Sequence, residues 1–98
     1  MEREKFEKIL ENYKEKKEYS KINEFLEKQI IYFYYQKLIM KLGKFTFRNR
    51  LRMLEEMEKN LDIEDCVNFR KFFKVTSNYE LSEKDLFEEL ETIYYDMY

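Results

Sequence analysis

The scarcity of helix breakers constrains the fold of this chain more than any other feature. The sequence contains one glycine, Gly43, and no proline, and these are the two residues that interrupt helices most strongly. Long helices can therefore run without a break. Nine phenylalanines and nine tyrosines provide large side chains for a core, which argues against disorder although 41% of the residues are charged. The 98 residues fit one domain, spanning 1–98.

Hydrophobic periodicity predicts an all-α fold, a compact domain of four or five helices with a long second helix at its centre. The expected helices cover about residues 2–18, 21–42, 47–60 and 63–73, with a fifth from Ser82 onward and a loop at 74–82. In the third helix, the expected apolar seam consists of Phe47, Leu51, Leu54 and Leu61, with Met53 and Met57 beside it.

Several residues are expected to mark the helix ends. Gly43 follows Leu42 and can adopt the left-handed conformation that closes a helix. Ser20 and Asp62 are the expected N-caps of the second and fourth helices. The run Ser82-Glu83-Lys84-Asp85 has the spacing of a capping box, which predicts where the fifth helix begins.

The sequence IIYFYY at residues 30–35 is apolar around a full helical turn. This pattern predicts that the second helix is contacted on both sides, by the first, third and fifth helices. A β-strand is the alternative, because β-branched and aromatic residues favour strands, but no turn signal bounds the segment. A second hypothesis is that Tyr32, Tyr34 and Tyr35 stay exposed and serve as aromatic anchors for a partner.

Charge is separated along the chain. Residues 28–54 carry seven cations and no acid, whereas residues 55–98 have a net charge of −8. The basic residues nearest Gly43 form a candidate binding patch: Lys37, Lys41, Lys44, Arg48, Arg50 and Arg52. Helical spacing would place the three lysines on one face. Three interpretations remain open: a solvated edge partly neutralised by the fifth helix, a phosphate-binding site with aromatic stacking, and a contact for an acidic protein.

The fifth helix carries a candidate acidic face, formed by Glu83, Asp85, Glu88, Glu89, Glu91 and Asp96. Its charge excludes the recognition helix of a helix-turn-helix protein, since phosphates would repel it. An acidic helix can instead occupy the basic nucleic-acid channel of another protein, with carboxylates where phosphates normally sit. An ordinary solvated face is the alternative.

The residues for common enzyme chemistry are missing. The chain has no histidine and a single cysteine, Cys66, so Ser–His and Cys–His nucleophiles and zinc-finger ligand sets cannot form. One glycine cannot make a phosphate-binding loop. We therefore expect a protein that is not an enzyme and has no catalytic residues, no metal and no cofactor, with Cys66 as a core residue.

The composition also favours a location. The first residues are highly charged rather than apolar, and no stretch of about 20 apolar residues occurs. We expect a cytoplasmic protein that does not engage a membrane.

Aromatic anchors, opposed charge patches and the missing chemistry together suggest a small protein-binding protein that acts by surface complementarity. The hypothesis is a stoichiometric inhibitor of a larger protein, such as a phage or mobile-element inhibitor of a host defence nuclease (anti-CRISPR-like). One alternative is a nucleic-acid-binding protein that uses residues 37–52. Another is a structural homo-oligomer or assembly adaptor, in which the basic segment of one chain meets the acidic helix of the next.

Overall fold

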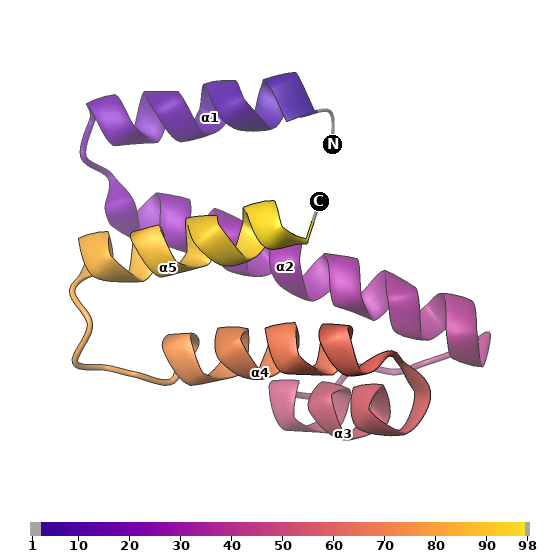
Figure 1. Ribbon diagram of the computed structural model, residues 1–98. Helices are drawn as coiled ribbons and strands as arrows, with labels where there is room; N and C mark the ends of the chain where they lie inside the picture. Colours follow the sequence, from indigo (N-terminus) through magenta and orange to yellow (C-terminus); the bar gives the residue numbers. More distant parts are fainter. Residues whose placement is uncertain (1–2, 98) are drawn as a thin grey trace.

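The computed structural model describes residues 3–97, and this part of the chain contains five α-helices and no strand. The helices are α1 (Arg3–Glu15), α2 (Tyr19–Leu42), α3 (Arg50–Asn60), α4 (Ile63–Thr76) and α5 (Glu83–Asp96). Figure 1 shows α1 on one side of α2 and α5, and α3 with α4 on the other side. The prediction of an all-α domain with four or five helices is confirmed.

The long helix α2 holds the domain together, because it contacts α1, α3 and α5. This confirms the three expected neighbours. Its fully buried apolar residues recur at every fourth position and form one stripe: Ile22, Leu26, Ile30, Tyr34 and Leu38. Each step of four residues turns the stripe by about 40°, so between Ile22 and Leu38 it winds about 160° around the helix axis. The side of α2 that enters the core therefore changes along the helix. The buried side chains of all five helices and of Phe45 belong to one cluster.

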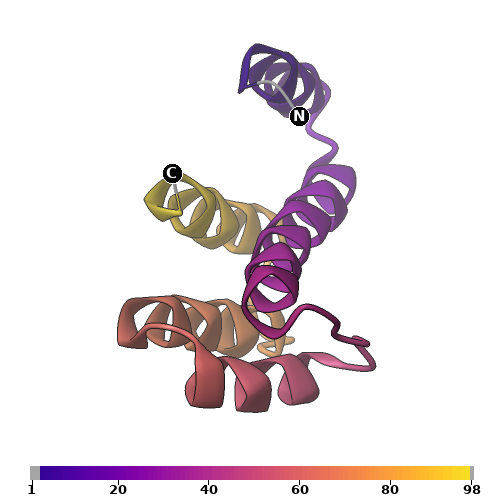
Figure 2. The ribbon, with the colours of Figure 1, turned by 90° about the vertical axis from the view of Figure 1, so that its right-hand side faces the viewer.

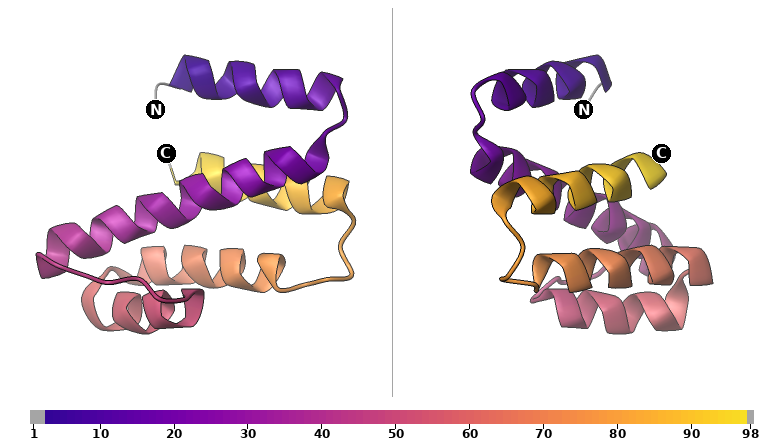
Figure 3. Two further views of the ribbon diagram at one scale, coloured as in Figure 1. Left: turned by 180° about the vertical axis from the view of Figure 1, so that it is seen from behind. Right: turned by 60° about the vertical axis from the view of Figure 1, so that its left-hand side comes forward.

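A flank of α2 is covered by non-helical chain. The segment between α2 and α3, residues 44–49, has no regular secondary structure. It places the rings of Phe45 and Phe47 at 6.0 and 6.5 Å from the ring of Tyr35. Figure 3 (left) shows this segment running from the end of α2 to the start of α3. Aromatic side chains of a connecting segment therefore shield part of the apolar circumference of α2.

The C-terminal end of α2 was predicted correctly, and its N-terminal start was not. Gly43 has φ 76° and donates its N–H to the carbonyl of Ile39 at 2.7 Å, as expected for a glycine that closes a helix. The expected N-cap Ser20 is wrong, because α2 already begins at Tyr19. The cap position belongs to Glu18, whose side chain makes no capping hydrogen bond.

The third helix begins later than the periodicity predicted. Asn49 is its N-cap, and the Asn49 side chain accepts a hydrogen bond from the backbone N–H of Arg52 at 2.8 Å. The predicted seam is also wrong in part: Met53 and Met57 are fully buried, whereas Leu51 is 55% exposed. The expected seam assumed a helix that starts at Phe47. Because the helix starts at Arg50 instead, a different set of side chains faces the core.

Helix α4 continues three residues beyond the predicted end, to Thr76, so the loop before α5 is shorter than expected. Asp62 occupies the N-cap position of α4, but its side chain makes no capping hydrogen bond.

Helix α5 is fastened at its start and along its inner face. The Ser82 hydroxyl accepts the backbone N–H of Asp85 at 3.1 Å, which confirms the predicted cap. The buried Asn23 of α2 donates its side-chain N–H to the carbonyl of Glu83 at 2.9 Å. Further along, the ring of Tyr94 stacks on Phe6 of α1 at a centroid distance of 4.0 Å. These contacts fix the position of α5 in the domain, and with it the direction in which its outer face points.

Candidate binding surfaces

Two adjoining depressions lie along the segment that connects α2 and α3. The first, which we call the basic hollow, has a volume of about 550 Å³. It is lined by Leu42, Lys44, Phe45, Thr46, Arg48, Arg52 and Glu56. The second, the aromatic groove, has a volume of about 490 Å³ and is lined by Lys28, Ile31, Tyr32, Tyr35, Thr46 and Phe47. Because Thr46 lines both, the two depressions meet at this residue.

The cations of the basic hollow are largely free of protein partners. Lys44 and Arg48 are exposed and make no ion pair or hydrogen bond with the described residues. The Nε atom of Arg52 lies 3.7 Å from a carboxylate oxygen of Glu56, which is the one acidic residue of the lining. The hollow therefore presents more positive than negative charge.

The connecting segment is held in place by Tyr35. The hydroxyl of this tyrosine donates a hydrogen bond to the carbonyl of Phe45 at 2.9 Å, and Phe45 itself is buried. These contacts fix the stretch of chain along which the basic hollow and the aromatic groove meet. Tyr32 lies at the outer side of the groove and is 61% exposed.

The predicted basic patch is divided into separate environments. Lys44 lies beyond the end of α2, so the expectation that it shares a helical face with Lys37 and Lys41 is wrong. Lys37 donates to Asp65 at 2.8 Å and also lies 4.7 Å from the centre of the Phe33 ring. Lys41 lines a different depression, which includes Asp62 and Asp65. Of the predicted set, Lys44, Arg48 and Arg52 surround the basic hollow, whereas Lys37 and Lys41 line the second depression together with the two aspartates.

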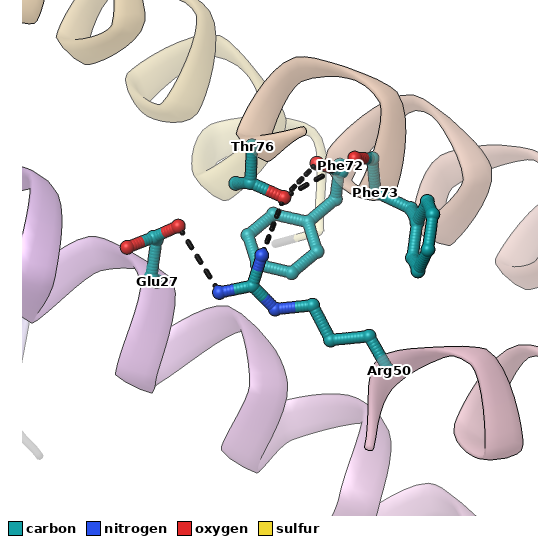
Figure 4. A network of polar contacts seen from close by, with 5 residues as sticks. All are labelled: Glu27, Arg50, Phe72, Phe73 and Thr76. Carbon is teal, nitrogen blue, oxygen red and sulfur yellow. Dashed lines mark hydrogen bonds and ion pairs between the residues drawn. The ribbon is translucent and has the colours of Figure 1, made fainter. Parts of the chain in front are cut away.

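Arg50 turns toward the interior and joins three helices, as Figure 4 shows. Its guanidinium donates to the Thr76 hydroxyl at 2.8 Å and to a carboxylate oxygen of Glu27 at 3.3 Å. The same group lies over the ring of Phe72, 5.5 Å from its centre. Arg50 therefore links α2, α3 and α4 through its side chain. Its assignment to the predicted binding patch was wrong.

The three predicted aromatic anchors have three different fates. Tyr32 is exposed and Tyr35 is half-buried at the base of the aromatic groove. Tyr34 is fully buried, so the prediction that it faces a partner is wrong; it follows the four-residue spacing of the α2 core stripe. Burial, and next the negative charge of Asp65, raise the pKa of the Tyr34 hydroxyl well above its ordinary value.

The predicted acidic face also divides. The carboxylate of Glu91 pairs with Lys14 of α1 at 3.0 Å, and Glu83 starts the helix away from the other acids. The remaining four residues lie within an arc of about 100° and over a length of about 16 Å. We call them the acidic stripe: Asp85, Glu88, Glu89 and Asp96. All four are exposed, and none forms an ion pair with any residue between 3 and 97.

The two kinds of surface are far apart in the fold. Figure 2 shows α5 and the segment of residues 44–49 on opposite sides of α2. No ion pair links α5 to this segment within the described part of the chain. The expectation that the fifth helix neutralises the basic edge therefore finds no contact to support it.

Sequence reasoning missed the aromatic groove as a unit. Its members on α2 are Lys28, Ile31, Tyr32 and Tyr35, which recur at intervals of three and four residues. This spacing was a usable signal, but the apolar run around it concealed which face would remain open. Thr46 gave no signal, because its position depends on the path of the connecting segment.

Within residues 3–97, the structure gives little indication of a metal site, a reactive thiol or a membrane-spanning helix. Within this range, no group of three histidine, cysteine, aspartate or glutamate side chains is placed to hold a metal ion. Cys66 is buried, and burial followed by the charge of Glu58 raises the pKa of its thiol. Every helix in the range falls short of the length or apolar character that crossing a bilayer requires. Comparisons with protein-family models, with curated proteins and with solved structures found no match to this chain.

Proposed function

We propose that this chain is a small non-catalytic binding protein that inhibits a larger protein by forming a stoichiometric complex with it. The contact surface in this proposal is the acidic stripe of α5. The observation that carries the proposal is the row of four exposed carboxylates on one helical face, none of them paired within residues 3–97. Such a row offers several negative charges along one side of a helix, and a nucleic-acid backbone also presents negative charges in a row.

The support beneath the stripe strengthens this interpretation. The inner face of α5 buries Phe87, Leu90, Ile93 and Tyr94, and its first turn is capped by Ser82. A rigid charged helix loses little conformational freedom on binding, so more of the electrostatic attraction is retained as affinity. Complementary charge also accelerates association with a basic partner.

The class of partner that fits is a protein with a basic channel for nucleic acid. A host defence nuclease is one such target, and an inhibitor of this kind would be encoded by a phage or mobile element. Small size and a surface built from charge and aromatic residues are what support this part of the proposal.

The experiment uses two charge-reversed variants that change the net charge equally. Glu88→Lys/Glu89→Lys reverses the centre of the acidic stripe, and Glu11→Lys/Glu15→Lys reverses two exposed, unpaired acids of α1 as a control. Tagged proteins are used to capture partners from a lysate of the organism that carries the gene. The captured protein is then purified, and its binding to nucleic acid is titrated with each variant.

We expect the unmodified protein and the α1 variant to abolish nucleic-acid binding by the partner at a 1:1 ratio, and the α5 variant to fail. Loss of inhibition in both variants, or in neither, would contradict a role for the acidic stripe. A doubling of mass with concentration at low salt, measured by light scattering and lost in the α5 variant alone, would instead favour the homo-oligomer.

A further inference from the structure

We propose that the basic hollow and the aromatic groove together bind single-stranded nucleic acid. This site lies across α2 from the acidic stripe and is independent of the function proposed above. The two depressions meet at Thr46, so one ligand can occupy both. The hollow offers cations to phosphate groups, and the groove offers ring faces to bases.

The cations that would contact phosphate groups are Lys44, Arg48 and Arg52. Two of these cations have no partner within residues 3–97, and the third faces Glu56 at 3.7 Å. Cations that are already neutralised by close carboxylates gain little from a phosphate, whereas unpaired cations gain the full contact and release counterions. The hollow thus differs from the neighbouring Lys37, which Asp65 holds at 2.8 Å.

The aromatic residues that would contact bases are Tyr32, Tyr35 and Phe47. Their side chains line the aromatic groove, and Tyr32 is 61% exposed. Stacking on such rings accepts any base, because every base has a π-face. Bases in a duplex are already stacked on one another and cannot reach the rings, so the geometry favours a single strand.

The backbone of the connecting segment adds further donors. None of the N–H groups of residues 44–48 donates a hydrogen bond to an acceptor in the described chain. The hydrogen bond from Tyr35 to the carbonyl of Phe45 holds this stretch against α2. Polar N–H groups, cations and aromatic faces are therefore presented together by about six residues of chain and the adjacent turns of α2.

An acidic polypeptide is the other macromolecule that the basic hollow could attract. It would use the cations but would have no general reason to place flat rings against Tyr32. The contribution of this tyrosine to binding therefore distinguishes the two ligands.

The test measures fluorescence anisotropy of a labelled oligothymidine, about 12 nucleotides long, at increasing salt. Three cation contacts predict a slope of about −2 for log affinity against log salt concentration. Arg48→Ala should make this slope shallower by about 0.7. Tyr32→Ala should weaken binding by about 5- to 150-fold and leave the slope unchanged.

Two matched controls remove the same groups elsewhere. Lys84→Ala deletes an exposed, unpaired cation of α5, and Tyr79→Ala deletes a tyrosine that is 96% exposed in the loop before α5. Neither should change the affinity by more than about twofold. All four side chains are exposed, so the variants should fold, and circular dichroism at 222 nm verifies this.

The proposal is overturned if the oligonucleotide does not bind at low salt, or if a duplex binds equally well and Tyr32→Ala has no effect. Tighter binding of a labelled poly-glutamate peptide than of the oligonucleotide would assign the hollow to an acidic protein instead. Glu88→Lys/Glu89→Lys should retain nucleic-acid binding, so failure of this proposal and failure of the inhibitor proposal are distinguishable.

Discussion

The adjacent residues Tyr34 and Tyr35 provide a sharp test of the packing, because the same chemical change should have opposite effects at the two positions. The hydroxyl of Tyr34 is buried and has no hydrogen-bond partner of adequate geometry among the described residues. The hydroxyl of Tyr35 donates to the carbonyl of Phe45 at 2.9 Å. Replacement of each tyrosine by phenylalanine removes one oxygen and keeps the ring.

The expected magnitudes follow from these two environments. A buried hydroxyl without a partner costs about 1–3 kcal/mol, so Tyr34→Phe should raise the free energy of unfolding by about 1 kcal/mol. The ring still contacts Phe69, whose centre lies 5.3 Å away. Tyr35→Phe loses a hydrogen bond with a net value of about 0.5–1.5 kcal/mol, so it should lower the free energy of unfolding. The two variants should then differ by about 2 kcal/mol, or roughly 8–16 °C in Tm.

Urea unfolding followed by circular dichroism at 222 nm measures both changes against the unmodified protein. A Tyr34→Phe variant that is less stable by about 1 kcal/mol or more would refute the reasoning. It would show that the hydroxyl is satisfied, either by the side chain of Asn68, which acts to lower the pKa of Tyr34, or by a buried water. Equal destabilisation of both variants would lead to the same conclusion.

The pH dependence supplies a second readout for Tyr34. Its folded-state pKa is raised, first by burial and then by Asp65 and Glu64. A group with a raised pKa stabilises the fold fully below its unfolded pKa, which is about 10 for tyrosine, and this contribution is lost as the pH rises above that value. The advantage of Tyr34→Phe over the unmodified protein should therefore widen above about pH 10.

Three further predictions follow from the same structure. Arg50→Met should lower the free energy of unfolding by about 1–3 kcal/mol in urea, because a charged hydrogen-bond network is lost, whereas Arg48→Met should change it by less than about 0.5 kcal/mol. Ser82→Ala should cost about 1 kcal/mol and fray the start of α5, seen as faster amide exchange there. Alkylation of Cys66 near pH 8.5 should be far slower in the folded protein than in urea, because burial both raises the thiol pKa and restricts access; equal rates would contradict its burial.

The class of fold was predictable because the responsible signals are local. This chain has no proline and has apolar residues at helical spacing. Helices are therefore the simplest structure in which its backbone groups can form their hydrogen bonds. The Gly43 C-cap, with its positive φ, and the Ser82 N-cap each depend on a few neighbouring residues, and both cap positions were predicted correctly. The predicted start of α3 was wrong. Apolar periodicity favoured Phe47, but the side chain of Asn49 accepts a hydrogen bond from the N–H of Arg52 and caps the helix there.

The candidate surfaces were less predictable, because they depend on tertiary placement. Arg48 and Arg50 are two residues apart and look alike in the sequence, yet one is exposed and the other reaches Glu27 and Thr76. The different environments of Arg48 and Arg50 depend on where α3 begins and on how the helix is oriented against α2 and α4. Likewise, the run of tyrosines alone does not reveal that Tyr34, and not Tyr32, lies on the core stripe. The signal is the four-residue spacing of apolar residues over the whole of α2.

The separation of the two charged surfaces bears on whether they can act independently. The smallest dimension of the molecule is 22 Å, whereas electrostatic screening acts over about 8 Å at physiological ionic strength and about 30 Å at 0.01 M. Surfaces on opposite sides of α2 should therefore be uncoupled in the first condition and coupled in the second. Charge reversal on the acidic stripe should strengthen nucleic-acid binding across α2 only at low salt. An equal effect at both salt concentrations would show that the stripe and the basic hollow communicate through the fold rather than through the field.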